Sequence, residues 1–271
     1  MKQSHDLRIL CPVCKKGRLT PPSESIVDWQ CIECFAHYPV REGVIDLLPY
    51  APGKQSIVQT LMEWPPLVQI YETRFWRLSP VIAALAQISF EQEYQLIKTA
   101  ANLENASKVL DLACGPGLYA RRLARDLGAG LVFGLDVSLP MLRRASELTQ
   151  IESLKNLILI HANALELPFE ADEFDVINCG GALHLFPDPQ HVLSEVHRVL
   201  KPGGRFTLAA LRHGANPLGE HFSAARRLFY GINSFTQHDL DARLRQAGFS
   251  ESDCLHAAGF WMIMSTRKSS E

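Results

Sequence analysis

The sequence predicts an α/β protein in which helices cover both faces of a mostly parallel sheet, with a small cysteine-rich module in front. Two observations lead to this fold class. From residue 108 onward, short apolar runs alternate with helical segments, which is the pattern of repeated βα units. Before that, four of the seven cysteines lie in two C-x2-C pairs. The chain of 271 residues, 47% of them hydrophobic, is long enough for one full domain plus a small module.

The composition favours a globular protein without a dominant electrostatic field. The formal net charge is −2 and the pI is near 6.6, so no overall field attracts nucleic acid, although a local basic patch stays compatible with this average. The start, MKQSHDLRIL, lacks the apolar core of a signal peptide, and no run of about 18 apolar residues is found. We expect a cytoplasmic location.

The cysteine pairs predict a structural zinc ribbon over residues 1–50. Cys11 and Cys14 form the first pair, and Cys31 and Cys34 follow after sixteen residues. Four thiolates on two short turns can close a tetrahedron around Zn²⁺, and so small a segment has little core of its own. Disulfides are disfavoured in a reducing cytosol. Four sulfur ligands leave no open position for catalysis, so we expect a folding role for the metal.

The ribbon also carries a resemblance to known families. The stretch FAHYPVREGVIDLLP alternates and then becomes apolar, as the last strand of a zinc ribbon does. The whole segment resembles the ribbon at the front of ribosomal RNA guanine-N1 methyltransferases and the zinc fold of small activator subunits of tRNA methyltransferases. The resemblance leaves four roles open: RNA contact, a protein interface, a wall over an active site, or a folding staple against the main domain.

Residues 51–104 are expected to form a linker and N-terminal helices. The stretch APGKQS is typical of a linker. Tyr71, Phe75 and Leu78 then follow at helical spacing, and Pro80 ends or kinks that helix. These aromatic residues either form a lid over an acceptor pocket or simply pack. A further helix is expected from Phe90 to about Asn102.

The turn VLDLACGPGLYA raises the question of the cofactor. Gly115, Gly117 and Ala120 fit the G-x-G-x-x-G/A spacing of a dinucleotide-binding turn. Asp111, however, would repel a pyrophosphate at the helix N-terminus, whereas it favours a ligand with an ammonium and a sulfonium, such as S-adenosylmethionine. Asp136 lies nineteen residues after Gly117, where a carboxylate can accept both ribose hydroxyl protons in either class.

Five motifs in order extend this inference over residues 105–210. The stretches VLDLACGPG, GLDVS, NALELPF, FDVINCGGALHLFPDP and VLKPGGRF resemble the class I S-adenosylmethionine-dependent methyltransferases, especially the branch with quinone-biosynthesis enzymes. The resemblance implies a Rossmann-like sheet of seven strands over residues 105–271, closed by an antiparallel hairpin around Gly259. It places a set of residues at the cofactor: Asp111, Gly115 and Gly117 at the methionine portion, Asp136 at the ribose, Asn163 and Ala164 at the adenine, and the Cys179 carbonyl at the cofactor amine. Asn163 departs from the usual aspartate, but its amide oxygen can still accept a hydrogen bond.

The methyl acceptor is less well defined. Enzymes of this fold that methylate exocyclic base nitrogens usually carry Asn or Asp followed by Pro-Pro and an aromatic residue after the fourth strand, whereas this chain has Asn178-Cys179-Gly180-Gly181. If a hydroxyl or an activated carbon is the target, a histidine can accept a proton. The candidates follow the fourth strand or lie in an acceptor-side insertion at about 211–234: His184, His213, His221 and Tyr230.

Three functions remain open at this point. The first is methyl transfer to a small, aromatic or lipid-like acceptor, favoured by the aromatic residues 61–78 and the missing Pro-Pro motif. The second is an RNA guanine methyltransferase, favoured by the ribbon. Its phosphate contacts would come from three arginine pairs: Arg121-Arg122, Arg143-Arg144 and Arg226-Arg227. The third is a non-catalytic, cofactor-binding scaffold with the ribbon as its partner surface.

Overall fold

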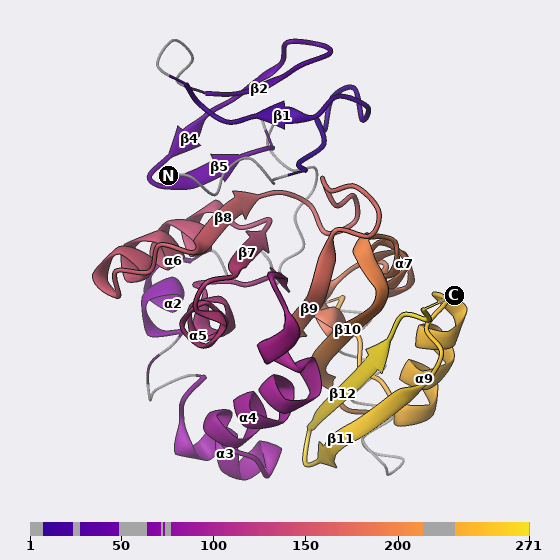
Figure 1. The fold of residues 1–271 in the computed structure, drawn as a ribbon. Coiled ribbons are helices and arrows are strands. Elements are labelled where there is room, and N and C mark those ends of the chain that lie inside the picture. Colours follow the sequence, from indigo (N-terminus) through magenta and orange to yellow (C-terminus); the bar gives the residue numbers. More distant parts are fainter. Residues whose placement is uncertain are drawn as a thin grey trace.

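The computed structural model describes residues 8–23, 28–48, 64–71, 73, 77–213 and 231–270. A sheet of nine strands runs through the molecule, and a separate sheet of three strands lies near the N-terminus (Figure 1). The strands of the small sheet are β1 (Leu19–Thr20), β2 (Trp29–Cys31) and β3 (His37–Tyr38). Those of the large sheet are β4 (Val40–Arg41), β5 (Val44–Asp46), β6 (Lys108–Leu112), β7 (Leu131–Asp136), β8 (Leu157–His161), β9 (Phe174–Gly180), β10 (Leu200–Leu211), β11 (Ser252–Ala258) and β12 (Trp261–Arg267).

The order of the large sheet is β11-β12-β10-β9-β6-β7-β8-β5-β4. Strands β5 to β10 pair in parallel where they are neighbours, and β12 and β11 close the sheet as an antiparallel hairpin around Gly259, as the sequence predicts. The chain moves outward from β6 through β7 to β8, then returns to the other side of β6 with β9. This reversal creates a crevice at the carboxyl ends of β6 and β9, where open α/β sheets bind ligands.

The sheet has nine strands rather than the expected seven. The two additional strands, β4 and β5, come from the stretch that the sequence assigned to the end of the zinc ribbon. Glu42 and Gly43 both have positive φ, at 52° and 80°, so they form a tight two-residue hairpin. All three residues of β5 are buried, and β5 pairs with β8. It therefore covers an edge that β8 would otherwise expose.

Helices cover both faces, which confirms the predicted fold class. Buried side chains of α4, α5 and α6 pack on one face of the sheet, and those of α7 and α9 pack on the other. The helices are α2 (Pro65–Ile70), α3 (Pro80–Ala86), α4 (Phe90–Ala101), α5 (Leu118–Leu127), α6 (Leu139–Ile151), α7 (Pro189–Val199) and α9 (Gln237–Gln246). Short 3-10 turns lie at Leu103–Asn105 and Leu183–Leu185. No helix in the described part of the chain is long and apolar enough to cross a membrane.

Helix α4 begins and ends where its sequence predicts. The Ser89 hydroxyl accepts a hydrogen bond from the backbone N–H of Gln92, and the Gln92 side chain accepts one from the Ser89 N–H, which completes a capping box. Asn102, in a left-handed conformation, ends the helix. Of the aromatic residues expected nearby, Phe75 and Trp76 lie outside the described residues.

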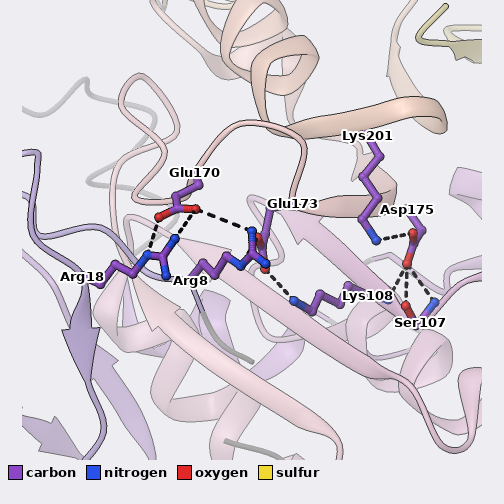
Figure 2. Close-up of polar contacts among 8 residues, drawn as sticks. All are labelled: Arg8, Arg18, Ser107, Lys108, Glu170, Glu173, Asp175 and Lys201. Atoms are coloured by element: carbon purple, nitrogen blue, oxygen red, sulfur yellow. Dashed lines mark hydrogen bonds and ion pairs between the residues drawn. The ribbon is translucent and has the colours of Figure 1, made fainter. Parts of the chain in front are cut away.

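The N-terminal module is fixed to the main domain by a continuous set of contacts. Ile9 bridges to Phe169, and the backbone N–H of Leu10 donates to the Pro168 carbonyl over 2.9 Å. Figure 2 shows the polar part of this interface. Arg18 makes two hydrogen bonds to Glu170, at 2.5 and 3.0 Å, and Arg8 lies between Glu170 and Glu173. These ion pairs join the ribbon to the segment that precedes β9.

Candidate cofactor and acceptor site

A cavity of about 500 Å³ lies at the predicted edge of the sheet. Its wall is built from the residues that directly follow β6, β7, β8 and β9, together with the start of α5 and a few residues before α3. The lining residues that carry the argument are Gly115, Asp136, Asn163, Ala164, Gly180 and Arg77. Because parallel strands end at the same edge, the order of the strands also gives the order of these residues along the cavity.

The turn after β6 has the conformation that its glycines allow. Gly115 and Gly117 have φ of 54° and 87°, and Gly117 caps the N-terminus of α5. A Cβ atom added at Gly115 would meet no heavy atom within 4 Å, although this residue lines the cavity. Gly117 is not on the wall, and a Cβ there would lie 3.3 Å from Ala145. Gly115 therefore leaves open space for a ligand, while Gly117 shapes the turn.

Asp136 at the end of β7 is held rigidly on the wall. Its Oδ2 accepts a hydrogen bond from the backbone N–H of Gly115 at 2.7 Å, and its Oδ1 accepts one from Ser138 at 2.8 Å. Burial raises the pKa of Asp136, against the lowering effect of these backbone N–H groups. Each carboxylate oxygen has a further lone pair, so the group can still accept hydrogen bonds from a diol.

Asn163 and Ala164 follow β8 and line the same cavity, next in order after Asp136. The Asn163 Oδ1 accepts a hydrogen bond from the backbone N–H of Leu165 at 3.0 Å, which fixes the turn. Ala164 is buried and presents only a methyl group. The segment can thus offer a flat apolar surface beside one amide.

Asp111 and Cys179 lie behind the wall rather than on it, since neither is among the lining residues. Asp111 accepts a hydrogen bond at Oδ1 from the Asn178 amide over 2.7 Å, and no hydrogen-bond partner is found for its buried Oδ2 among the described residues. Burial raises the pKa of Asp111 to about 7 and that of the Cys179 thiol to about 12. Direct contacts of Asp111 and of the Cys179 carbonyl with a ligand stay predictions.

The two histidine candidates that the structure describes, His184 and His213, are not brought to the cavity. His184 is 7% exposed, its ring lies 6.1 Å from that of Trp261, and its Nδ1 accepts from the Leu211 N–H at 3.4 Å. His213 Nδ1 lies 3.3 Å from the Ser234 hydroxyl, again away from the lining residues. His221 and Tyr230, with most of the 211–234 insertion, lie outside the described residues. The geometry gives no support to His184 or His213 as a base.

Sequence reasoning missed a polar cluster on the cavity wall. Arg77 Nη2 donates to Glu93 Oε2 at 2.7 Å and to the Tyr119 hydroxyl at 2.9 Å, and that hydroxyl donates to Glu93 Oε1. Arg77 and Tyr119 line the cavity, and Glu93 is only 1% exposed. The one signal in the sequence is a glutamate on the buried face of helix α4, which requires a cationic partner.

The four ribbon cysteines come together as predicted. Their sulfur atoms all lie within 4.8 Å of one another. Backbone N–H groups point at the sulfurs, from Gly17 to Cys14 at 3.3 Å and from Glu33 to Cys31 at 3.4 Å. Hydrogen bonds from the Lys16 and Gly17 backbone lower the pKa of the Cys14 thiol to about 6, which favours a thiolate. This donor set fits a tetrahedral zinc ion.

Comparisons with known proteins agree with this geometry. A family profile described as "Methyltransferase domain" matches residues 109–204. An uncharacterized chloroplastic methyltransferase of Arabidopsis thaliana is 28% identical over 214 residues, covering 73% of this chain and 60% of its own length. A demethylmenaquinone methyltransferase of Geobacillus stearothermophilus is 36% identical over 129 residues, covering 47% and 54% of the two chains.

A solved structure supports the same fold. Phosphoethanolamine N-methyltransferase 2 of Haemonchus contortus, in complex with S-adenosyl-L-methionine, superposes with a TM-score of 0.66 at 17% identity, covering 80% of this chain and 61% of the other. Residues 109–204 thus match a methyltransferase domain, and the chain has the fold of the class I S-adenosylmethionine-dependent methyltransferases. It spans 60% and 54% of the length of the two curated relatives named above. Four of the five motifs of the sequence coincide with the strand ends that surround the cavity, whereas VLKPGGRF lies at the start of β10, away from the lining residues.

Proposed function

We propose that this protein transfers the methyl group of S-adenosylmethionine to a small, largely apolar acceptor. A single observation carries the proposal: one cavity of about 500 Å³ combines polar groups suited to adenosine with an apolar region. The polar groups belong to Asp136, Asn163 and the turn at Gly115. The apolar region is formed by Leu118, Leu185, Phe186 and Pro187.

The residues present fit the donor. The open space over Gly115 is the cradle that a ligand would fill, and the two outward lone pairs of Asp136 suit the two ribose hydroxyls. Ala164 and Asn163 would contact the adenine ring. The buried Oδ2 of Asp111, for which no hydrogen-bond partner is found among the described residues, lies behind the glycine turn, where the ionised form of this carboxyl would favour a cationic ligand over a dinucleotide. When bound, the donor supplies an activated methyl group on a sulfonium.

The protein's own contribution is positioning. Methyl transfer from a sulfonium is an in-line displacement, so a pocket that holds the acceptor's nucleophilic atom against the methyl group supplies much of the rate, on the order of 7–11 kcal/mol. The apolar side chains of Leu185 and Phe186 exclude water from this region, and no histidine is found among the lining residues in the described part of the chain. We therefore propose an acceptor that ionises readily by itself, such as a hydroxylated aromatic or quinol-like ring. Several relatives are demethylmenaquinone methyltransferases, which agrees with this class.

The two arginine pairs that the structure describes give no support to the RNA alternative. Of the three arginine pairs, the two that are described are engaged by carboxylates. The ion pairs are Arg121 with Glu152, Arg122 with Glu91, Arg143 with Glu42, and Arg144 with Glu147. Arg226 and Arg227 lie outside the described residues. Phosphate contacts would have to compete with these pairs.

We propose a structural zinc ion for the ribbon, which then acts as a folding staple against the main domain. The fit of the four sulfurs supports the ion, and the ion pairs of Arg18 and Arg8 in Figure 2 support the staple. Metal analysis of carefully prepared protein tests the first part. About one equivalent of zinc is expected, and less than about half an equivalent would refute it.

The acceptor proposal is tested by supplying methyl-labelled S-adenosylmethionine with total RNA in one reaction and with a metabolite and lipid extract in another. Label in an apolar small molecule is expected. Label in ribosomal RNA would overturn the proposal in favour of the RNA alternative. Label in neither fraction, with the donor bound, would favour a non-catalytic scaffold. Asp136→Ala serves as the control that removes the proposed ribose contact.

A further inference from the structure

Three buried polar side chains lie in a row at the carboxyl ends of β5, β8 and β7. The parallel register pairs Asp46 at the end of β5 with His161 at the end of β8, and His161 with Asp136 at the end of β7. The three residues are only 7%, 6% and 8% exposed, respectively. Asp136 lines the cavity, whereas Asp46 belongs to the stretch that follows the four ribbon cysteines. His161 alone therefore separates an acidic residue of the N-terminal module from the proposed ribose site.

The His161 ring is held from both sides. Its Nδ1 lies 2.8 Å from Asp46 Oδ1, and its Nε2 lies 3.0 Å from the backbone carbonyl oxygen of Val137. Val137 directly follows Asp136, and both residues line the cavity, whereas His161 is not among the lining residues. Asp46 is itself fixed, since its Oδ1 also accepts from the backbone N–H of Leu48 at 3.2 Å. The ring thus links the N-terminal strand β5 to the turn that carries Asp136.

The two partners of His161 determine how many protons its ring needs. A backbone carbonyl and an ionised carboxylate can only accept hydrogen bonds, and a neutral imidazole has a single N–H to donate. A neutral ring would therefore turn a lone pair toward either Asp46 or Val137. An imidazolium donates to both, and Asp46 is its buried counterion. The proton between them belongs to the ring, because imidazole is the stronger base.

A charged His161 also acts on the neighbouring carboxyl group. Burial raises the pKa of Asp136, while the backbone N–H groups around it and the charge of His161 act to lower it. An ionised Asp136 can accept a hydrogen bond from each of two ribose hydroxyls, whereas a protonated carboxyl would carry a donor of its own. His161 therefore fixes the turn at Val137 and favours the form of Asp136 that suits a ribose.

We propose that His161, protonated and held by Asp46, is a positioning residue for the ribose of the methyl donor, and that it acts through the turn at Asp136 and Val137. This inference rests on the proposed function, since it requires an adenosine-containing donor in the cavity. It also gives the N-terminal module a role beyond that of a folding staple, because strand β5 supplies the counterion of a group that shapes the donor site.

The test measures binding of S-adenosylhomocysteine to the full-length protein by titration calorimetry. Because His161→Gln alone would leave the Asp46 carboxylate buried without a cation, the main variant is the double change His161→Gln with Asp46→Asn, which keeps the pair neutral. This double change is made in the wild-type protein and again in the Asp136→Ala background. Glu42→Gln is the matched control, since Glu42 lies on the same β4–β5 hairpin and makes an exposed ion pair with Arg143 at 3.0 Å.

The double change should weaken binding of S-adenosylhomocysteine about 5- to 30-fold in the wild-type background. In the Asp136→Ala background it should cost less than about two-fold, because the contact that His161 positions is already gone. Equal fold losses in the two backgrounds, or no loss in either, would overturn the role of His161. A comparable loss in Glu42→Gln would assign the effect to the hairpin as a whole and would also overturn it.

Heteronuclear NMR of protein labelled in its histidine rings tests the charge of His161 directly. The signal of His161, identified by its absence from the double variant, should show two protonated ring nitrogens at neutral pH. Asp46→Asn should leave the ring with one, because the counterion is lost. A single protonated nitrogen in the wild-type ring would overturn the charged state. Wild-type protein that binds no S-adenosylhomocysteine, whatever the NMR result, would instead refute the proposed function.

Discussion

Replacement of Gly115 by alanine separates the ligand space of the turn from its backbone geometry. Gly115 lines the cavity with φ of 54°, and an added Cβ atom meets nothing within 4 Å. The variant should therefore fold without a clash. Its free energy of unfolding should fall only by the cost of a left-handed conformation at alanine, about 1–2 kcal/mol. This loss corresponds to a melting temperature lower by roughly 2–8 °C.

The Gly115→Ala substitution should reduce the affinity for the donor more than it reduces the folding stability. The added methyl group occupies the open space in which the donor is proposed to lie, and overpacking of one methyl group costs about 1–3 kcal/mol. The affinity for S-adenosylhomocysteine should fall by roughly 5- to 150-fold. Titration calorimetry measures this affinity, and thermal unfolding of the same samples measures stability.

Gly128→Ala is the matched control. Gly128 also has positive φ, at 63°, and open space around its Cβ position, but it lies at the end of α5 and not on the cavity wall. Both substitutions destabilise the backbone, but only Gly115→Ala should weaken the binding of S-adenosylhomocysteine. Equal affinities for the two variants would refute the placement of the donor over Gly115.

Three further perturbations test other parts of the account. Gly180→Ala places a Cβ 2.4 Å from the Tyr119 ring, so chemical denaturation should show a loss of about 1–3 kcal/mol, and unchanged stability would contradict the described packing. Burial raises the pKa of Asp111 from its ordinary value of 3.8 to about 7, because the folded state favours the neutral carboxyl. The contribution of this group to folding stability is therefore complete below pH 4 and is lost as the pH rises through 7. Relative to Asp111→Asn, the wild-type free energy of unfolding should fall by up to about 1.4 kcal/mol per pH unit between pH 4 and 7, and parallel pH profiles would show that the carboxyl is not buried. Cys31→Ser with Cys34→Ser should remove the zinc and also weaken S-adenosylhomocysteine binding, because the ribbon holds the segment that continues from the cavity wall; full affinity in zinc-free protein would refute this coupling.

The central sheet could be predicted because each of its strands carries its own signal. A buried apolar run followed by a glycine or an acidic residue identifies β6, β7 and β9 without knowledge of their neighbours. The cysteine cluster is likewise local, since ligand type and spacing define it. These are the features on which sequence and structure agree.

The remaining features depend on long-range contacts. Strand β5 has three residues and no helix before it, and only its pairing with β8 shows that it belongs to the large sheet. Arg77 becomes part of the cavity because Glu93 and Tyr119, far away in sequence, hold its side chain. The distance of Asp111 to Gly115 predicts a place at the ligand, and this contact stays a prediction, but its hydrogen bond to Asn178 behind the wall could not be foreseen. Spacing along the chain does not determine the direction of a side chain at a strand end.

The most direct test of the account is the choice of cofactor by the wild-type protein. Titration calorimetry should show binding of S-adenosylmethionine and S-adenosylhomocysteine, and no heat with NADH, because the buried carboxylate of Asp111 behind the glycine turn opposes a pyrophosphate there. Tight binding of NADH together with no heat from either sulfur-containing ligand would contradict the central claim.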